Sequence, residues 1–234
     1  MSDAPAAHHH EHHEHGHGNF AESNKKYFDE HAAKYDDVPG AVELASRISE
    51  KILKKYPFDE ERTTVLDYAC GTGLISRNLA PHTKSIVGVD ISQGMVDQYN
   101  LRVSNQGIPP EEMKAVRAEL KGDDNELGGA KFDVVVCSMA YHHFDSIDDT
   151  TRVLAHFVRP GGRLMVADLY RGDDALIPEQ YKHVAHHHGI DTGELKDVFA
   201  KHGIVGFEHE HAATFTMHGK EMSAFLAVGT KQAA

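Results

Sequence analysis

The chain has 234 residues, of which 40% are hydrophobic and 26% are charged, and this length suits one globular domain with a full core. Its formal net charge of −12 argues against a nucleic-acid partner, which requires a broad basic face. No apolar run approaches the roughly 20 residues that span a bilayer, and no apolar segment of a secretory signal opens the sequence. Two cysteines, Cys70 and Cys137, are too few for a disulfide framework. We therefore expect a cytoplasmic protein without a membrane partner.

Histidine is unusually frequent, with 20 residues in the chain. The stretch HHHEHHEHGHGN, from His8 to Asn19, is of low complexity and cannot build a core. We expect residues 1–19 to form a disordered tail ahead of a single domain over residues 20–234. Imidazoles at this density bind Zn²⁺, Ni²⁺ or Cu²⁺ loosely, so a metal-dependent regulatory role is an alternative, although no defined metal site is predicted.

Two amphipathic helices are predicted at the start of the domain. The first, over residues 24–37, is capped by Asn24 and places Tyr27, Phe28, His31 and Tyr35 on one side. The second, over residues 40–56, ends before Pro57. Its inward-facing residues are expected to be Val42, Leu44, Ala45, Ile48, Ile52 and Leu53.

Strands and helices alternate from Thr63 onward. Strands are predicted over residues 63–69, 84–90, 113–120, 132–140 and 163–170, and helices over 74–80, 92–105, 147–158 and 191–203. This alternation indicates an α/β fold in which helices cover both faces of a parallel sheet. The last two strands, over 204–217 and 222–231, follow each other through a short turn, so they should pair antiparallel at one edge.

The stretch VLDYACGTGLIS, residues 65–76, carries a sharp turn between the first strand and its helix. Gly71 and Gly73 permit positive φ and close backbone approach by a ligand at the carboxyl ends of the strands. The next strand ends at Asp90, whose carboxylate suits both hydroxyls of a ribose. These features favour an adenosine ligand. A nicotinamide or flavin site is a rival, but Ser76 replaces the third glycine of that fingerprint.

Four motifs in this order, VLDYACGTG, IVGVDIS, FDVVVCSMAYHHF and VRPGGRLMVAD, resemble the motif series of class I S-adenosylmethionine-dependent methyltransferases. The resemblance runs from about residue 27 to residue 231. It implies a Rossmann-like three-layer sandwich whose seven-stranded, mostly parallel sheet has its last strand antiparallel, and S-adenosyl-L-methionine as the cofactor. The sequence departs from the family pattern at Ala69, where the first glycine of the loop would stand.

The resemblance also implies residue roles. The methionine portion would be held by Asp67 and the backbone of Ala69, Gly71 and Gly73, with Ser138 beside it. Asp90 would take the ribose, and Ile91, Met95, Glu119 and Leu120 would surround the adenine. Tyr27 and Tyr35 resemble lid aromatics. Core packing is the alternative for Met95, Leu120 and the two tyrosines.

Catalytic and acceptor-binding residues are expected from two histidine clusters. The stretch YHHF, starting at Tyr141, follows the fourth strand and makes His142 and His143 candidate general bases, with Tyr141 beside the acceptor. In the second cluster, His186, His187 and His188 are expected to line the acceptor site, with capping as the alternative. On a helix His183 and His187 would also have metal-ligand spacing, but no H-E-x-x-H pattern accompanies them.

The predicted function is methyl transfer from S-adenosylmethionine to an oxygen, nitrogen or sulfur of a small molecule. No tetrapeptide of the N-P-P-Y type follows the fourth strand, which favours a small acceptor over nucleic acid or protein. The alternatives are a non-catalytic cofactor- or metal-binding regulatory protein and a nicotinamide oxidoreductase.

Overall fold

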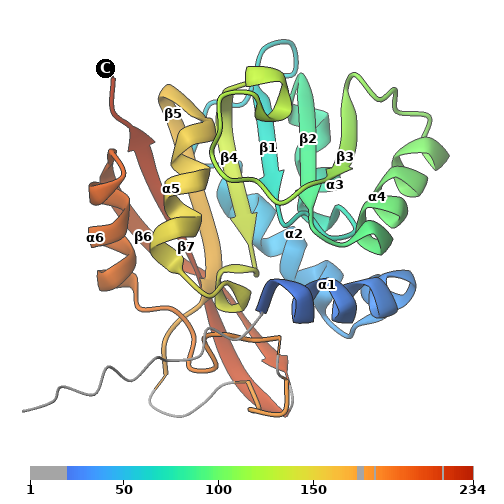
Figure 1. Ribbon diagram of the computed structural model, residues 1–234, viewed down its shortest axis with the longest axis vertical. Helices are drawn as coiled ribbons and strands as arrows, with labels where there is room; N and C mark the ends of the chain where they lie inside the picture. Colours follow the sequence, from blue (N-terminus) through green and yellow to red (C-terminus); the bar gives the residue numbers. More distant parts are fainter. Residues whose placement is uncertain (1–19, 173–176, 182, 218, 234) are drawn as a thin grey trace, which may run out of the picture.

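A seven-stranded sheet lies at the centre of the computed structural model, which describes residues 20–172, 177–181, 183–217 and 219–233 (Figure 1). The strand order is β3-β2-β1-β4-β5-β7-β6. The strands are β1 Thr64–Tyr68, β2 Ser85–Asp90, β3 Met113–Arg117, β4 Phe132–Ser138, β5 Val158–Leu169, β6 Ile204–Met217 and β7 Lys220–Lys231.

Strand directions follow the sequence prediction. The first five strands pair in parallel, whereas β7 is antiparallel to both β5 and β6. The order reverses at β1, whose neighbours are β2 and β4. Ligands of open α/β sheets bind outside the carboxyl ends of the strands at such a reversal. The topology therefore predicts a binding site at the residues that follow β1, β2 and β4.

Helices cover both faces of the sheet, which confirms the predicted three-layer architecture (Figure 1). One core cluster joins the sheet to α5 and α6, and the other joins it to α2, α3 and α4. The helices are α1 Phe20–His31, α2 Ala41–Ile52, α3 Leu74–Leu79, α4 Gln93–Asn105, α5 Ile147–Phe157 and α6 Thr192–Lys201, and the 3₁₀ turns are η1 Ala32–Asp37, η2 Ala80–His82, η3 Glu126–Gly129 and η4 Tyr141–His143.

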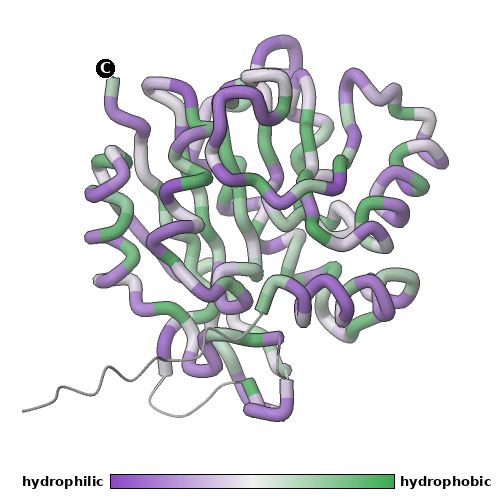
Figure 2. The backbone as a smooth tube through the Cα atoms, in the orientation of Figure 1, coloured by the Kyte–Doolittle hydropathy of each residue, from purple (hydrophilic) through white to green (hydrophobic). Residues whose placement is uncertain are grey.

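Burial on both faces explains why the central strands are apolar throughout. Val65 and Leu66 are adjacent in β1, yet each is fully buried in a different core cluster. Successive side chains of a strand point to opposite faces, so a strand with helices on both sides has no solvent face. Figure 2 shows hydrophobic strands in the middle of the molecule and mixed polarity along the outer helices.

Two local predictions were wrong. Asn24 does not cap a helix, because α1 already begins at Phe20; its buried side chain instead donates from Nδ2 to the His143 carbonyl at 3.1 Å. Val42 is 54% exposed and does not face the core. The segment around His183 and His187 is not helical, because the backbone N–H groups of Ala185 and His186 donate to the His142 carbonyl, so the spacing that these histidines would have on a helix does not apply.

None of the helices among the described residues is long and apolar enough to cross a membrane. The predicted tail over residues 1–19, with its histidine tract, lies outside the described residues.

The geometry of the turn after β1 predicts that alanine destabilises the protein less at Gly71 than at Gly73. Gly71 and Gly73 have φ of 53° and 86°, so alanine at either position adopts a strained left-handed conformation costing about 1 kcal/mol. A Cβ at Gly71 meets nothing within 4 Å, whereas one at Gly73 lies 2.7 Å from Tyr99 Cδ2. In urea unfolding, Gly71→Ala should therefore lower the unfolding free energy by about 1 kcal/mol and Gly73→Ala by about 2–4 kcal/mol. Equal losses would contradict this packing.

Candidate active site

The turn between β1 and α3 is built from backbone conformations that few residues tolerate. Ala69, Gly71 and Gly73 all have positive φ, at 55°, 53° and 86°. Ala69 therefore occupies a left-handed position despite its Cβ, at a strain of roughly 1 kcal/mol. The turn delivers the chain into α3, whose N-cap is Gly73.

Asp90, the last residue of β2, ties this turn to the neighbouring strand. Its Oδ2 accepts the Gly71 N–H at 2.9 Å, and its Oδ1 accepts the Ser92 N–H at 2.9 Å. A carboxylate offers about four lone-pair positions, so two acceptor positions are left after these bonds. Burial raises the pKa of Asp90, while the bonds from Ser92 and Gly71 oppose that rise. The side chain is thus fixed in orientation and still able to accept from a ligand.

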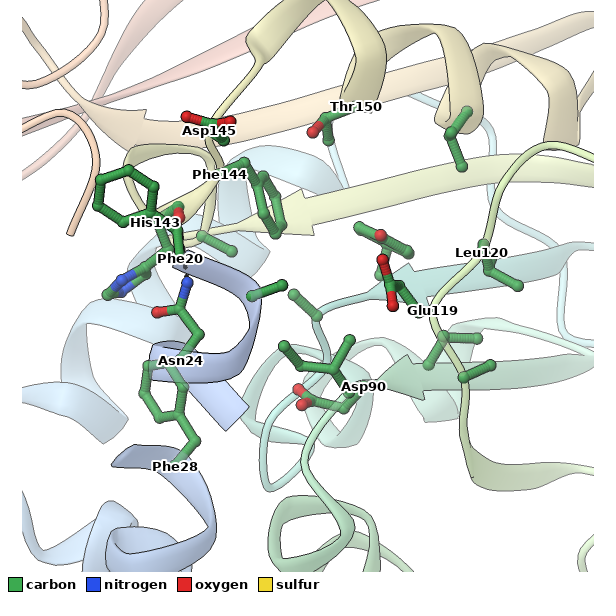
Figure 3. Close-up of a pocket in the computed structure, with 18 of the residues that line it drawn as sticks. Phe20, Asn24, Phe28, Asp90, Glu119, Leu120, His143, Phe144, Asp145 and Thr150 are labelled. Atoms are coloured by element: carbon green, nitrogen blue, oxygen red, sulfur yellow. Dashed lines mark hydrogen bonds between the residues drawn. The ribbon is translucent and has the colours of Figure 1, made fainter. Parts of the chain in front are cut away.

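A first cavity of about 540 Å³ lies at the carboxyl ends of β1, β2 and β4. Figure 3 shows Phe20, Asn24 and Phe28 of α1 on one side of it and Asp90, Glu119 and Leu120 on the other. The predicted site residues that line it are Tyr35, Ala69, Gly71, Asp90, Ile91, Met95, Glu119, Leu120, Ser138 and His143. The Oδ1 of Asn24 is a buried acceptor with no hydrogen-bond partner among the described residues, so it could accept from a donor of a ligand in this cavity.

A second cavity of about 530 Å³ adjoins the first. The predicted site residues in its lining are Tyr27, Tyr35, Asp67, Ala69, Gly71, Ser138, His142 and His143. Seven residues line both cavities: Phe28, Tyr35, Ala69, Gly71, Ser138, Met139 and His143. The two spaces therefore adjoin over the β1 turn and the end of β4, a place that we call the junction.

Four rings form a stack along the second cavity, which we call the ring column: His31, Tyr27, His183 and His143. Centroid distances between consecutive rings are 4.2, 3.8 and 5.2 Å, with interplanar angles of 20°, 15° and 15°. Such near-parallel contacts favour a single arrangement of the rings. The column joins α1 to η4 and to the segment around His183.

His143 is held as a neutral imidazole. Its Nδ1 lies 3.0 Å from the His183 carbonyl, so Nδ1 carries the proton and Nε2 is the basic nitrogen. Burial, together with neighbouring His142, lowers the pKa of His143 well below its usual value. Burial likewise lowers the pKa of His183 to about 4. Both rings therefore stay uncharged at neutral pH.

His142 has a different partner. Its Nδ1 lies 2.7 Å from Oδ1 of Asp168, which is fully buried at the end of β5. The same carboxylate accepts the backbone N–H of His142 at 3.3 Å and that of Leu169 at 2.7 Å. A carboxylate at Nδ1 fixes the tautomer, makes Nε2 the proton acceptor and stabilises the imidazolium. His142 and Asp168 thus have the geometry of a general-base pair.

Asp67 lies beneath the junction of the cavities and is almost completely buried. Burial raises its pKa to about 7; the bond donated by Ser76 at 2.6 Å lowers it, and nearby Asp90 raises it further. A carboxyl group with this pKa changes its charge near neutral pH, and a cation beside it favours the ionised form.

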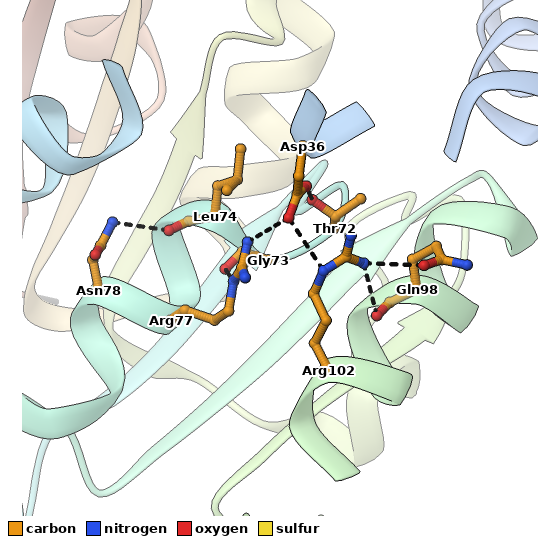
Figure 4. Close-up of polar contacts among 8 residues, drawn as sticks. All are labelled: Asp36, Thr72, Gly73, Leu74, Arg77, Asn78, Gln98 and Arg102. Carbon is orange, nitrogen blue, oxygen red and sulfur yellow. Dashed lines mark hydrogen bonds and ion pairs between the residues drawn. The ribbon is translucent and has the colours of Figure 1, made fainter. Parts of the chain in front are cut away.

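The segment that closes the site from outside, residues 20–37, is anchored to α3 and α4. Asp29 Oδ1 accepts the Ser92 hydroxyl at 2.7 Å and the Gly94 N–H at 2.9 Å. Asp36 Oδ2 lies 2.8 Å from an Arg77 nitrogen and 3.1 Å from Arg102 Nε (Figure 4). These bonds hold aromatic residues of the segment over both cavities.

Several predicted residues lie away from the cavities. Gly73 packs against Tyr99, and Tyr141 is fully buried with its hydroxyl 3.2 Å from Thr151. His186, His187 and His188 line neither cavity, and His187 donates from Nδ1 to the Ile177 carbonyl. The site roles assigned from the sequence otherwise remain predictions.

Sequence reasoning missed three contributors to the site. His183 was considered only as a metal ligand, and Asp168 and Asn24 were given no role in a site. Asp168 ends an apolar strand in the motif VADL, as Asp67 and Asp90 end theirs, and that shared position was an available signal. The pairing of Asp168 with His142 depends on the neighbouring register of β4 and β5, which no local pattern encodes.

Comparison with protein families gives a match over residues 65–162 to the model described as "Methyltransferase domain". An uncharacterized methyltransferase of Schizosaccharomyces pombe is 43% identical over 145 residues, covering 58% of this chain and 51% of the relative. A ubiquinone biosynthesis O-methyltransferase of Rhizobium etli is 31% identical over 118 residues, covering 50% and 46%. The chain thus spans about half the length of the curated relatives it matches.

Solved structures share the fold. A putative methyltransferase of Haloferax volcanii, in complex with the Trm112 methyltransferase activator, has a TM-score of 0.69 at 19% identity over 88% of this chain and 98% of its own. A Haemonchus contortus phosphoethanolamine N-methyltransferase has a TM-score of 0.69 at 15% identity over 93% and 60%. These structures confirm the fold predicted from the motifs, and the family match over residues 65–162 agrees with the resemblance.

The raised pKa of Asp67 predicts a specific pH dependence of stability. Because its native pKa of about 7 exceeds the unfolded value of 3.8, its contribution is complete below pH 3.8 and is lost as pH rises through 7. Relative to Asp67→Asn, the wild-type unfolding free energy should fall by up to about 1.4 kcal/mol per pH unit between pH 4 and 7. Urea unfolding at several pH values measures this difference, and parallel curves for the two proteins would refute it.

The Asp36 contacts predict local loosening when they are removed. Asp36→Ala leaves Arg77 and Arg102 without this carboxylate, so amide hydrogen exchange in η1 and the end of α1 should accelerate on the order of tenfold. Asp97→Ala, at an exposed aspartate of α4, is the matched control and should leave exchange there unchanged. Equal exchange in both variants would show that Asp36 does not anchor the segment.

Proposed function

We propose that this chain, which carries a class I S-adenosylmethionine-dependent methyltransferase domain over residues 65–162, transfers a methyl group from S-adenosylmethionine to a small-molecule acceptor. The observation that carries the proposal is the junction of two cavities over the positive-φ turn after β1. Methyl transfer needs two ligands in contact at one point, and the junction provides such a point.

The residues of the first cavity fit an adenosyl ligand. Asp90 keeps two acceptor positions for ribose hydroxyls, and the space beside Gly71 is open, since a Cβ there meets nothing within 4 Å. Buried apolar side chains, including Met95 and Leu120, offer a surface for a base. Asn24 Oδ1 provides a further buried acceptor.

The cofactor supplies a methyl group on a sulfonium, which is already activated for displacement. What the protein must add is alignment of the acceptor and removal of its proton. Positioning of the reacting atoms is worth several kcal/mol in well-oriented sites. Residues 20–37, anchored through Asp29 and Asp36, place Phe28 and Tyr35 against both cavities and so cover the junction.

The charge of the junction also suits this reaction. Positive charge disappears when a sulfonium is demethylated, so an environment with few fixed anions is favourable. His143, which lines both cavities, is neutral. His142, oriented by Asp168, is the group we assign as general base for an acceptor that must lose a proton.

The relatives support a small-molecule acceptor and do not define its reacting atom. One is named as an O-methyltransferase and one structural neighbour as an N-methyltransferase. The proposed partner of this chain is therefore a small acceptor that enters the second cavity.

Replacement of Asp90 tests the cofactor site. Asp90→Ala removes two charged hydrogen bonds to the ribose, so affinity for S-adenosylhomocysteine measured by calorimetry should fall at least about 100-fold. Asp90→Asn keeps the shape of the side chain and one oxygen acceptor, so its affinity for S-adenosylhomocysteine should fall less than that of Asp90→Ala. Asp97→Ala, at an exposed aspartate of α4 that lines neither cavity, is the control and should keep the wild-type affinity. Wild-type affinity in Asp90→Ala, with a normal melting temperature, would overturn the assignment.

A further inference from the structure

The second cavity has a composition that discriminates among acceptors. Nine of the described residues that line it carry aromatic rings: Tyr27, Phe28, His31, Tyr35, His142, His143, Tyr181, His183 and Phe215. Its aliphatic and thioether residues include Leu44, Ile48, Ile177, Val184 and Met217. Ring faces and edges pack best against another flat ring. The cavity therefore favours a planar, largely apolar ligand.

Charged side chains are few in this lining. Among the described residues it contains no arginine; Lys34 and Asp37 are both exposed on η1, and Asp67 lies at the junction. Phosphate and carboxylate ligands are usually held by arginine or by several donors together. One exposed lysine beside an aspartate does not form such a site, so an anionic acceptor is disfavoured.

The general base that we assign, His142, indicates which kind of acceptor atom is methylated. His142 lines the second cavity, and the Asp168 carboxylate fixes Nε2 as its proton acceptor. A neutral amine already carries its lone pair and needs no base before it attacks. A hydroxyl needs one, because its oxygen becomes a strong nucleophile only as the proton leaves. A buried imidazole–carboxylate pair is thus matched to an acidic O–H group.

We propose that the second cavity binds an uncharged aromatic alcohol, a phenol, and that the His142–Asp168 pair removes its hydroxyl proton during O-methylation. The inference rests on the proposed function and specifies its substrate class. The phenolic oxygen forms a bond to the methyl carbon while the carbon–sulfur bond breaks, and that electron pair stays on sulfur as a neutral thioether. The hydroxyl proton moves to His142 Nε2 and is later released to water. Asp168 acts as a positioning residue, since it lines neither cavity and acts on the acceptor only through its bond to His142 Nδ1.

A set of matched acceptors tests the substrate class with the full chain and labelled S-adenosylmethionine. We expect 4-methoxyphenol to be methylated at least 100-fold faster than 4-hydroxyphenyl phosphate, which adds an anion, and 4-methoxycyclohexanol, which lacks the planar ring. Preference for 4-methoxybenzylamine, 4-methoxybenzenethiol or the phosphate would overturn the proposal. Calorimetry with S-adenosylhomocysteine is done first: absent binding rejects the proposed function, whereas binding without phenol methylation rejects the phenol alone.

An acidic phenol, which is already ionised in the assay, separates loss of the base from a general loss of activity. At an assay pH where 4-nitrophenol is ionised and 4-methoxyphenol is not, His142→Gln and Asp168→Asn should lose at least 100-fold in kcat with 4-methoxyphenol and less than tenfold with 4-nitrophenol. A variant that fails to fold loses both activities and shows a lowered melting temperature. Equal losses in a folded variant would overturn the role of the pair.

Binding to the wild-type protein gives an independent spectroscopic measurement. When S-adenosylhomocysteine and 4-nitrophenol are both present, transfer of the phenol proton to His142 should produce nitrophenolate absorbance below the pH at which 4-nitrophenol ionises in solution. Tyr27, Tyr35, Tyr181, Asp67 and the other imidazoles also face this space, so Asp168→Asn is the control and should abolish the shift. A shift of the same size in that variant would assign the proton to another group.

Discussion

The hydrogen bond from Gly71 N–H to Asp90 is the interaction on which the site depends. It joins the turn after β1 to the end of β2 at the point where the strand order reverses. Because the donor is backbone, it exists only while Gly71 keeps its left-handed conformation, and that conformation leaves the neighbouring space free of side chains. The open space of the first cavity, the orientation of the Asp90 carboxylate and the junction with the second cavity therefore all depend on the left-handed conformation of Gly71.

Much of the fold was predictable because its signals are local or periodic. Central strands buried on both faces read as continuous apolar runs, and the Gly-Thr-Gly turn and Asp90 stand where the topology places a ligand. Ser92, a residue type that favours N-caps, precedes α4, and its hydroxyl accepts the Met95 N–H at 3.1 Å. Such features need no knowledge of distant residues.

The parts of the site that escaped prediction depend on contacts between distant segments. Asn24 looked like a helix cap because its residue type favours caps, yet it bonds to a carbonyl 119 positions away. The expectation for the second histidine cluster was that His186, His187 and His188 line the acceptor site, but the backbone N–H groups of Ala185 and His186 donate to the His142 carbonyl and fix a different arrangement. His183 then enters the ring column, and His187 turns toward Ile177. Residue type and spacing alone could not distinguish which histidine would reach the cavity.

Residues 20–37 contribute to both cavities, and this shared cover has a kinetic consequence. Phe28 and Tyr35 line the two spaces at once, so a displacement of this segment large enough to admit one ligand also uncovers the other. An acceptor seated first would be exposed again whenever the larger ligand entered beneath the same helix. For the proposed methyl transfer, this arrangement favours ordered association, in which the adenosyl compound binds first and its demethylated form leaves last, and re-opening of the segment would then limit turnover.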